Sequence, residues 1–427
     1  MKIGLEAHVS LPTKSKLFCS CSTIASEPNS AVCPICMGFP GAKPMLNEEA
    51  LKIAVSIANA LNCKVNEMVS FVRKVYFYPD LPKSYQITQL YEPIGINGYV
   101  ECCNGNIGIR RVQLEEDAAK IIRGDDYTLL DFNRAGIPLV EIVTDPDIKS
   151  EEELRTFLTE LRSILYYLGI DIEGELKTDL NISLAESRVE VKNITGIRNL
   201  IDATRYEIQR QEKLIKSRVK VVQETRSYIE AKRETIATRE KETEEEYGFI
   251  PEPDLTSYGT THMARIKPIY ASKIAEEYAK AYNVDKKLIA ELILFDRHAL
   301  ELIDATKDRY EMKFILNGIE LVKKYKKRDI KVGAFEKLVE LIKEGSYIDE
   351  ETVSKIEKGE SIGAKNLNLE TIRKEVNGLL TPSIIADYKK NPKAINFIIG
   401  RIAAKYKVSP KEVAEIVKKE LSGQYGD

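Results

Sequence analysis

The sequence predicts an α+β protein in which an antiparallel sheet precedes a helical region. Segments with alternating apolar and polar residues, typical of half-buried strands, occur from the N-terminus to about residue 192. From residue 271 onward this alternation stops and apolar residues recur with the period of a helix. We therefore expect a sheet domain at 1–270, a helical domain at 271–360 and a helical tail at 361–427.

Each predicted strand has one apolar face and one face of acids, amides and bases. The alternation appears in the first ten residues, around 112–117 and 138–143, and in a hairpin over 176–191. Glu115 and Asp117 are two residues apart and should point the same way, whereas Glu141 lies inside an apolar run. The polar positions that can supply metal or phosphate ligands are Glu6, His8, Glu115, Glu141, Asp179 and Asn181.

These polar positions indicate a cation site on the sheet. A carboxylate inside an apolar run has to be paired or bind a cation, because an unpaired buried charge costs too much free energy. Mg²⁺ prefers carboxylate oxygens, and phosphate oxygens can complete its coordination shell. We interpret the polar face as the floor of a catalytic cleft. For any single strand, solvated acids at a sheet edge are an equally good explanation.

Several helices are predicted from apolar periodicity and capping residues. Asn47 can cap a helix that ends near Asn62, and Ser150 can cap a helix that ends before Gly169. A third segment with helical periodicity covers 199–218. In the C-terminal region the candidate helices are 271–282, 286–304, 310–325 and 334–343.

Two segments are expected to lack regular structure. Residues 73–86 are rich in Tyr, Lys and Arg and contain two prolines, which indicates an irregular loop, either functional or packed down by its aromatic rings. Residues 223–247 are very polar and contain an acidic run, which is typical of a solvated face.

Four cysteines after the first strand form two close pairs. Cys19 and Cys21 make a C-x-C pair, and Cys33 and Cys36 make a CxxC knuckle. Four thiolates in this pattern suit a tetrahedral structural zinc ion, with reduced cysteines that bind no metal as the alternative. The odd number of cysteines, seven, and an N-terminus unlike a signal peptide indicate a reducing, cytoplasmic location.

The composition excludes several classes of protein. A net charge of −2 neither requires nor excludes a nucleic-acid partner, and no apolar run approaches the roughly 18 residues of a membrane span. The chain has no GxxxxGK[ST] phosphate loop, no GxSxG motif and only three histidines, which leaves little room for His-based acyl transfer.

The C-terminal tail carries the best nucleic-acid footprint in the chain. Between residues 382 and 411 a single acid, Asp387, accompanies seven basic residues: Lys389, Lys390, Lys393, Arg401, Lys405, Lys407 and Lys411. Such a cluster can bind the phosphate backbone of a nucleic acid. A basic solubilising surface is the alternative interpretation.

Longer motifs give the sequence a family resemblance. They are IGLEAH at 3–8, CPIC at 33–36, YFYPDLPK at 76–83, LEED at 114–117, FNRAGIPLVE at 132–141 and PEPDL at 251–255. In these motifs the sequence resembles the B subunit of the glutamyl/aspartyl-tRNA amidotransferase, the GatB family, over essentially the whole chain. The related archaeal E subunit carries a large inserted domain, for which this chain has no room after Leu255.

The resemblance implies a fold and an activity. The fold would be a glutamine-synthetase-like catalytic cradle, a helical domain and a YqeY-like tail that binds tRNA. ATP would phosphorylate the side-chain carboxylate of glutamate on tRNA(Gln), and ammonia from a partner amidase would then displace the phosphate. The same reaction would convert Asp-tRNA(Asn). The partners in a heterotrimer would be the A subunit, which is the amidase, and the small C subunit.

The resemblance also implies roles for single residues. A catalytic Mg²⁺ site would comprise Glu6, His8, Glu115 and Glu141. Lys74 and Lys83 would line the ammonia path, Arg134 would be a further catalytic group, and Asp179 and Asn181 would lie in the ATP-binding shell. Two other functions fit parts of the pattern: a non-catalytic, zinc-containing tRNA-binding subunit and an autonomous metal hydrolase. The acids on the sheet face discriminate between catalysis and binding alone.

Overall fold

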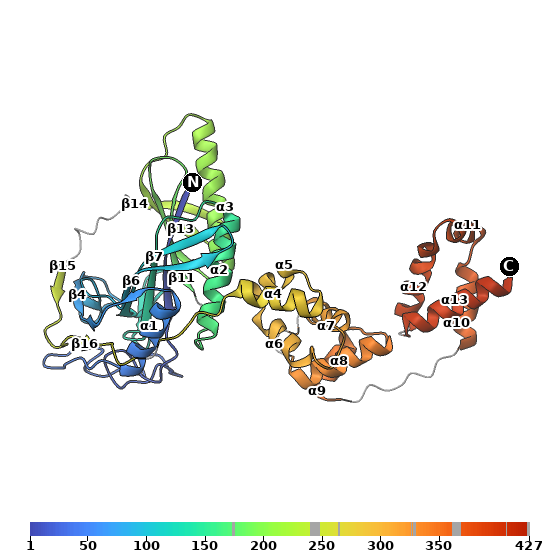
Figure 1. The fold of residues 1–427 in the computed structure, drawn as a ribbon, viewed down its shortest axis with the longest axis horizontal. Coiled ribbons are helices and arrows are strands. Elements are labelled where there is room, and N and C mark those ends of the chain that lie inside the picture. Colours follow the sequence, from blue (N-terminus) through green and yellow to red (C-terminus); the bar gives the residue numbers. More distant parts are fainter. Residues whose placement is uncertain are drawn as a thin grey trace. The chain divides into compact units, whose positions relative to one another are not determined.

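A computed structural model describes residues 1–172, 176–239, 248–263, 265–325, 327, 330–360, 369–406 and 408–424. The chain forms two compact units, Met1–Phe295 and Asp296–Asp427 (Figure 1). The first unit contains a large sheet with helices α1 to α5, and the described part of the second unit is helical. The predicted α+β class is therefore confirmed.

A nine-stranded sheet is the centre of the first unit, counted over the described residues, in the order β14-β13-β12-β11-β1-β10-β7-β6-β2. Neighbouring strands are antiparallel except β12 and β13, which run parallel. The strands are β1 (Lys2–Ser10), β2 (Lys64–Val65), β6 (Gly95–Cys102), β7 (Gly105–Glu116), β10 (Pro138–Thr144), β11 (Lys177–Ser183), β12 (Val189–Thr195), β13 (Glu224–Ile229) and β14 (Glu234–Arg239). The predicted strands take up its middle.

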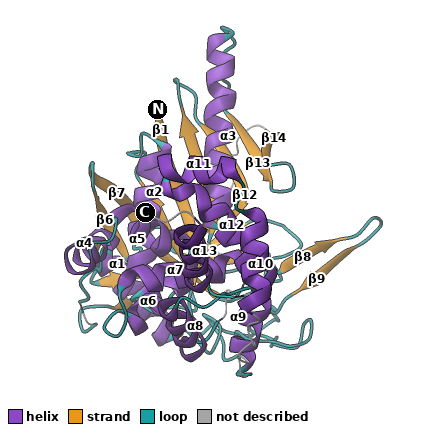
Figure 2. Cartoon of the chain, turned by 90° about the vertical axis from the view of Figure 1, so that its right-hand side faces the viewer, coloured by secondary structure: helices purple, strands orange, loops and turns teal. Residues whose placement is uncertain are grey.

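Smaller sheets accompany the large one. They comprise β15 (Gly248–Pro251) with β4 (Val72–Val75) and β5 (Tyr85–Thr88), β16 (Tyr258–Gly259) with β3 (Met68–Val69), and a ribbon of β8 (Lys120–Arg123) and β9 (Thr128–Asp131). The ribbon projects from the rest of the first unit (Figure 2). The expectation of an irregular segment at 73–86 is wrong at both ends, because β4 and β5 pair there and the prolines lie in the connection between them.

Helices α1 (Glu48–Ala60), α2 (Glu151–Tyr166) and α3 (Ile197–Lys216) pack on the apolar side of the large sheet. Asn47 and Ser150 cap α1 and α2 as predicted, since their side chains accept hydrogen bonds from backbone amides of the first turn. The core buries aliphatic residues that alternate with the polar positions of the strands, including Ile3, Leu5, Ala7, Val140, Ile142, Leu180 and Ile182.

The first unit also includes α4 (Ala271–Tyr282) and α5 (Lys286–Phe295), so it extends beyond the boundary expected after residue 270. Buried polar side chains of α2 hold these two helices. The Glu160 carboxylate accepts hydrogen bonds from the Ala271 and Ser272 amides at 2.6 and 3.0 Å. Arg162 donates to the Leu294 carbonyl at 2.5 Å. Both contacts place a charge at the helix end whose dipole it complements.

The described part of the second unit contains α6 (Arg297–Thr306), α7 (Met312–Lys324), α8 (Val332–Glu344), α9 (Glu350–Lys358), α10 (Leu369–Leu379), α11 (Pro382–Lys390), α12 (Asn396–Tyr406) and α13 (Pro410–Gln424). The helix predicted at 286–304 is two helices, because Asp296 interrupts it and caps α6 through the Ala299 amide at 3.1 Å. The boundary expected after residue 360 lies beside 361–368, outside the described residues. None of the described helices is both long and apolar enough to cross a membrane.

The polar segment at 223–247, predicted to be a solvated face, forms strands β13 and β14 in its described part and contains buried residues. Within the described residues up to 239, Arg226 and Thr235 are buried. Arg226 Nε donates to Thr235 Oγ1 at 2.8 Å, and Thr235 donates to the fully buried Glu207 of α3 at 3.1 Å. The segment is polar because it buries a hydrogen-bond network instead of aliphatic side chains. The acidic run at 242–246 lies outside the described residues.

Replacement of Glu160 by alanine should release the start of α4. Two charge-assisted bonds to backbone amides would be lost, which costs about 2 kcal/mol and raises the opening equilibrium of this turn roughly 30-fold. Hydrogen–deuterium exchange of peptides from 271–282 measures this change. The control is Glu277→Ala, because Glu277 is an exposed residue of α4. Equal exchange in both variants would contradict the capping role of Glu160.

Candidate functional site

The polar face of the sheet gathers titratable side chains around β1. This strand lies between β10 and β11, and Glu6, Ala7 and His8 have a partner on either side. His8 lies opposite Glu141 of β10, and Glu6 lies opposite Asp179 of β11. Glu115 comes from β7, the strand beyond β10. The predicted residues therefore share one face, as their two-residue alternation requires.

His8 joins the carboxylates of two strands. Its Nε2 lies 3.4 Å from Glu115 Oε1 and 3.7 Å from Glu141 Oε1. The other Glu115 oxygen accepts a hydrogen bond from Thr88 Oγ1 at 2.9 Å. Burial opposes protonation of His8, but the charges of Glu115 and Glu141 outweigh it, so the pKa of His8 lies above 6.5. The two glutamates therefore favour the protonated form of the imidazole.

One oxygen of the Glu141 carboxylate lacks a hydrogen-bond partner. This oxygen, Oε2, is buried, and Arg111 Nη2 lies 3.9 Å from it. Burial, together with the negative charge of Glu115, raises the pKa of Glu141 to about 7. The site is therefore short of positive charge and of hydrogen-bond donors at this oxygen.

A second acidic group lies on the other side of β1. Ligand atoms of Glu6, Asp179 and Glu190 all lie within 4.8 Å of one another. Asn181 donates to Glu6 Oε1 at 3.0 Å, and Lys192 Nζ lies 3.5 Å from Asp179 Oδ2. Burial raises the pKa of Asp179. Glu190 was missed as a site residue, although its alternating position in the predicted hairpin could have indicated it.

The predicted ligands thus fall into two adjacent groups. His8, Glu115 and Glu141 form one, and Glu6 belongs to the other, although Glu6 contributes to the electrostatic field at His8. Both groups lie on the same face of the sheet, which is what the alternation of polar residues predicts. The sharing of one ion by Glu6, His8, Glu115 and Glu141 stays a prediction.

Lys83, in the connection between β4 and β5, has a largely buried side chain at the end of β7. Its ammonium donates to Glu116, the residue after Glu115, and both side chains are less than a tenth exposed. Glu116 Oε1 also accepts a hydrogen bond from the Ile87 amide of β5 at 2.9 Å. Glu116 was not identified as a site residue from the sequence, because on a strand it points to the opposite face from Glu115. Only the tertiary structure brings it to Lys83.

Lys74 lies near an aromatic ring, and Arg134 contacts backbone carbonyls. Lys74 belongs to β4, and its Nζ lies 5.8 Å from the centre of the Tyr76 ring. Arg134 donates to the backbone carbonyls of Ala118 and Ala119 at 2.9 and 2.7 Å. It also approaches Asp117 Oδ2 at 3.4 Å. Arg134 therefore supports the chain just after β7.

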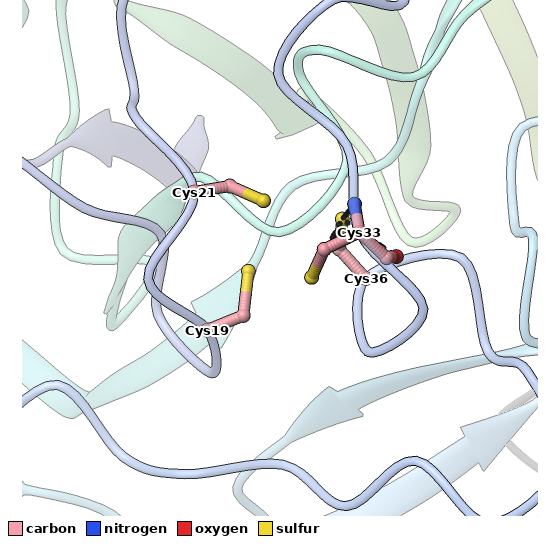
Figure 3. A group of neighbouring side chains, drawn as sticks. All are labelled: Cys19, Cys21, Cys33 and Cys36. Carbon is pink, nitrogen blue, oxygen red and sulfur yellow. Dashed lines mark hydrogen bonds between the residues drawn. The ribbon is translucent and has the colours of Figure 1, made fainter.

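The four cysteines of the predicted knuckle form one cluster (Figure 3). All four sulfurs lie within 4.8 Å of one another, and Cys33 and Cys36 Sγ are 3.9 Å apart. This spacing fits a single tetrahedral metal ion with thiolate ligands. A hydrogen bond from Cys19 and the Cys33 amide both favour the thiolate of Cys36, whose pKa falls to about 4. The cluster can hold a metal ion, as predicted.

A cavity of about 810 Å³ lies away from this face, between the start of α3, α2 and α5. Its arginines are largely neutralised, since Arg155 and Arg205 both bind Glu151 at distances of 2.6–3.2 Å. The predicted site residues do not line it. The predicted site residues therefore lie on the polar face of the sheet and not in this cavity.

Comparison with known proteins identifies the family of this chain. Residues 1–264 match the family described as the GatB/GatE catalytic domain. The chain is 37% identical to the B subunit of the aspartyl/glutamyl-tRNA(Asn/Gln) amidotransferase of Saccharolobus solfataricus, over 99% of both chains. The B subunits of the same name from Persephonella marina and Thermotoga maritima are each 36% identical, over 98% and 99% of both chains respectively.

The sheet unit is thus a catalytic domain of the GatB/GatE type. Because the likeness to B subunits extends over nearly the full length of the chain, this protein belongs to the GatB family of amidotransferase subunits.

The stability of the metal-free protein should fall as the pH rises from about 4.5 to about 7. The unfolded Glu141 carboxyl loses its proton near its ordinary value of 4.5, whereas the folded one keeps it to about 7. The folded state binds more protons in this interval, so a rising pH favours unfolding. Glu141→Gln should flatten this dependence, measured by denaturant unfolding in chelator with circular dichroism. Exposed Glu92 provides the control, Glu92→Gln, and an unchanged slope in Glu141→Gln would refute the assignment.

Proposed function

We propose that this chain is the catalytic B subunit of a tRNA-dependent amidotransferase that uses ATP and Mg²⁺. Its substrates would be Glu-tRNA(Gln) and Asp-tRNA(Asn), in keeping with the names of its relatives. The single observation that carries the proposal is the charge-deficient group of His8, Glu115 and Glu141 on the polar face of the sheet.

The residues of this group fit a divalent cation. Glu141 Oε2 is a buried carboxylate oxygen with no hydrogen-bond donor, and a hard cation satisfies such an oxygen directly. A metal ion would also supply positive charge between the two glutamates, and a histidine ligand would bind it in the deprotonated form. Glu6, His8, Glu115 and Glu141 would hold the ion, with Asp179 and Asn181 beside the nucleotide. When bound, Mg²⁺ offsets the negative charge on phosphate oxygens.

The proposed reaction activates a carboxylate, which is otherwise a poor electrophile. An oxygen of the side-chain carboxylate on the tRNA attacks the γ-phosphorus of ATP, and ADP leaves. Ammonia then attacks the acyl carbon, and phosphate leaves with both electrons of the carbon–oxygen bond. The products are the amide on the tRNA, ADP and phosphate. A carboxylate substrate and a triphosphate are both anionic, which is why the acidic floor needs a cation to accept them.

Residues of this chain would orient the reacting groups. Thr88 fixes one oxygen of Glu115, and Arg111 Nη2 lies 3.9 Å from the buried Oε2 of Glu141. Lys177, opposite His8 on β11, donates to Asp117 at 2.8 Å, so cationic side chains flank the acidic floor. Lys74, Lys83 and Arg134 are proposed to line the approach of ammonia and substrate.

The proposed complex contains an amidase, the A subunit, and a small C subunit, since a B subunit without a glutaminase site needs a supply of ammonia. The four-cysteine cluster is proposed to bind a structural zinc ion, because four thiolates fill a tetrahedral shell and leave no open position. The tail would contact the tRNA backbone through its basic residues. A cytoplasmic location follows from these substrates.

Replacement of Glu115 by glutamine should abolish tRNA-dependent ATP cleavage. The carboxylate would lose its charge while keeping its shape, so a loss of roughly 100-fold or more in rate is expected with tRNA affinity nearly unchanged. The assay uses the reconstituted complex with misacylated tRNA and scores ADP and amide product. Exposed Glu92→Gln is the matched control. Undiminished ATP cleavage in Glu115→Gln would favour the alternative, a zinc-containing subunit that binds tRNA without catalysis.

The double variant Arg401→Ala/Lys411→Ala should weaken tRNA binding. Both residues are exposed in the tail, and each lost phosphate contact should lower the slope of log affinity against log salt by about one. Lys405→Ala is the control, because Lys405 Nζ lies 2.7 Å from Glu375 Oε1 and is already neutralised. A salt slope equal to that of the unmodified chain would remove the tail from the proposed interface.

A further inference from the structure

The knuckle of the cysteine cluster packs directly against Lys83. Gly38 follows Cys36 by two residues and has a φ of +68°. A Cβ on Gly38 would lie 2.6 Å from Lys83 Cγ and 3.0 Å from Lys83 Cα. The second of these is a backbone atom, so the overlap could not be relieved by turning the lysine side chain alone. The knuckle backbone at Gly38 therefore packs so near Lys83 that no side chain fits between them.

The position of Gly38 depends on the knuckle turn. The Met37 amide donates to the Cys33 carbonyl at 3.0 Å, and the Gly38 amide donates to the Ile35 carbonyl at 3.1 Å. Cys33 and Cys36, which flank this turn, are two of the four residues whose sulfurs converge. A metal ion bound by all four thiolates would cross-link the turn to the loop of the first cysteine pair and fix it in place.

On its other side, Lys83 contacts the end of β7, next to Glu115 of the acidic floor. Its ammonium donates to Glu116, and Glu116 also holds the Ile87 amide of β5. Gln86 Nε2 donates to the Glu116 carbonyl at 2.7 Å. These bonds fasten the end of β7, which carries Glu115. A continuous path of packed groups thus leads from the knuckle through Gly38 and Lys83 to the strand that presents Glu115.

We propose that the four-cysteine cluster, when it holds its metal ion, positions Lys83 against Glu116 through the contact with Gly38. Lys83 and Gly38 are positioning residues in this proposal, which deepens the proposed function because Glu115 belongs to the proposed catalytic floor. A cluster that only stabilised its own loop would need no close contact with Lys83. The metal ion would thus influence the position of Glu115 through packed residues, without contacting the reacting groups.

The first test measures the accessibility of Lys83 and needs neither ATP nor tRNA. The full-length protein, with metal content determined by elemental analysis, is treated briefly with an amine-acylating reagent, and labelled lysines are quantified by mass spectrometry. Lys83 should be protected, and removal of the metal by a chelator should raise its labelling about tenfold, a change of about 1.4 kcal/mol in the free energy of local opening. Exposed Lys52 should label equally in both states.

The second test separates packing from metal loss. Gly38→Ala should keep the metal but raise labelling of Lys83, because its Cβ would displace the lysine. Gly41→Ala is the matched control: Gly41 also has a left-handed backbone, with a φ of +82°, but nothing lies within 4 Å of its added Cβ. Both variants carry the same kind of backbone strain, so a difference in Lys83 labelling reports the contact alone.

Three results would overturn the proposal. The first is equal labelling of Lys83 in Gly38→Ala and Gly41→Ala. The second is protection of Lys83 that persists after the metal is removed, in protein that circular dichroism shows to be folded. The third is a protected Lys83 in folded protein that never contained metal. Failure of the proposed catalysis is distinguishable from all three, because it would appear in the ATP assay and leave the labelling pattern unchanged.

Discussion

The concentration of buried carboxylates around the central strand β1 is the constraint on which the rest of the structure depends. Glu6 and His8 lie on this strand, with acids of both neighbouring strands opposite them. Like charges at this distance repel, and burial removes the water that would screen them. His8, Arg111 and Lys192 offset part of this charge within the protein, and the remaining deficit is what gives the face its capacity for a cation.

Polar contacts between segments that are distant in the sequence fix the strands around this face. Lys83 binds Glu116 at the end of β7, while Lys177 and Arg134 both approach Asp117 just beyond it. On the opposite side of the sheet, α2 uses buried charged side chains to hold α4 and α5. Paired charges of this kind give little net stability but require a particular geometry, so they determine position more than they add to folding free energy.

The sequence predicted those strands in which buried apolar residues alternate with polar ones, and it failed where a strand buries polar residues. Strands β1 and β11 bury aliphatic residues mainly on one face, so their alternation identified both the strand and the polar positions. Strand β10 is buried on both faces, and there the single carboxylate of Glu141 inside an apolar run indicated the site. Strands β13 and β14 instead bury Arg226 and Thr235 through a network to Glu207, which leaves no apolar alternation to read. Strands β4 and β5 escaped prediction because they are short and the prolines of the connection between them indicated an irregular segment.

The sequence alone determined which residues share a face, which cysteines lie close in the chain and where helices begin, because strand alternation, ligand spacing and helix caps are local properties. Only the tertiary structure decided that Glu190 joins Glu6 and Asp179, that Lys83 meets Glu116, and that Gly38 presses on Lys83. These contacts depend on strand order, register and loop packing. Such long-range arrangements come from burial of the whole core and leave no periodic signal in the chain.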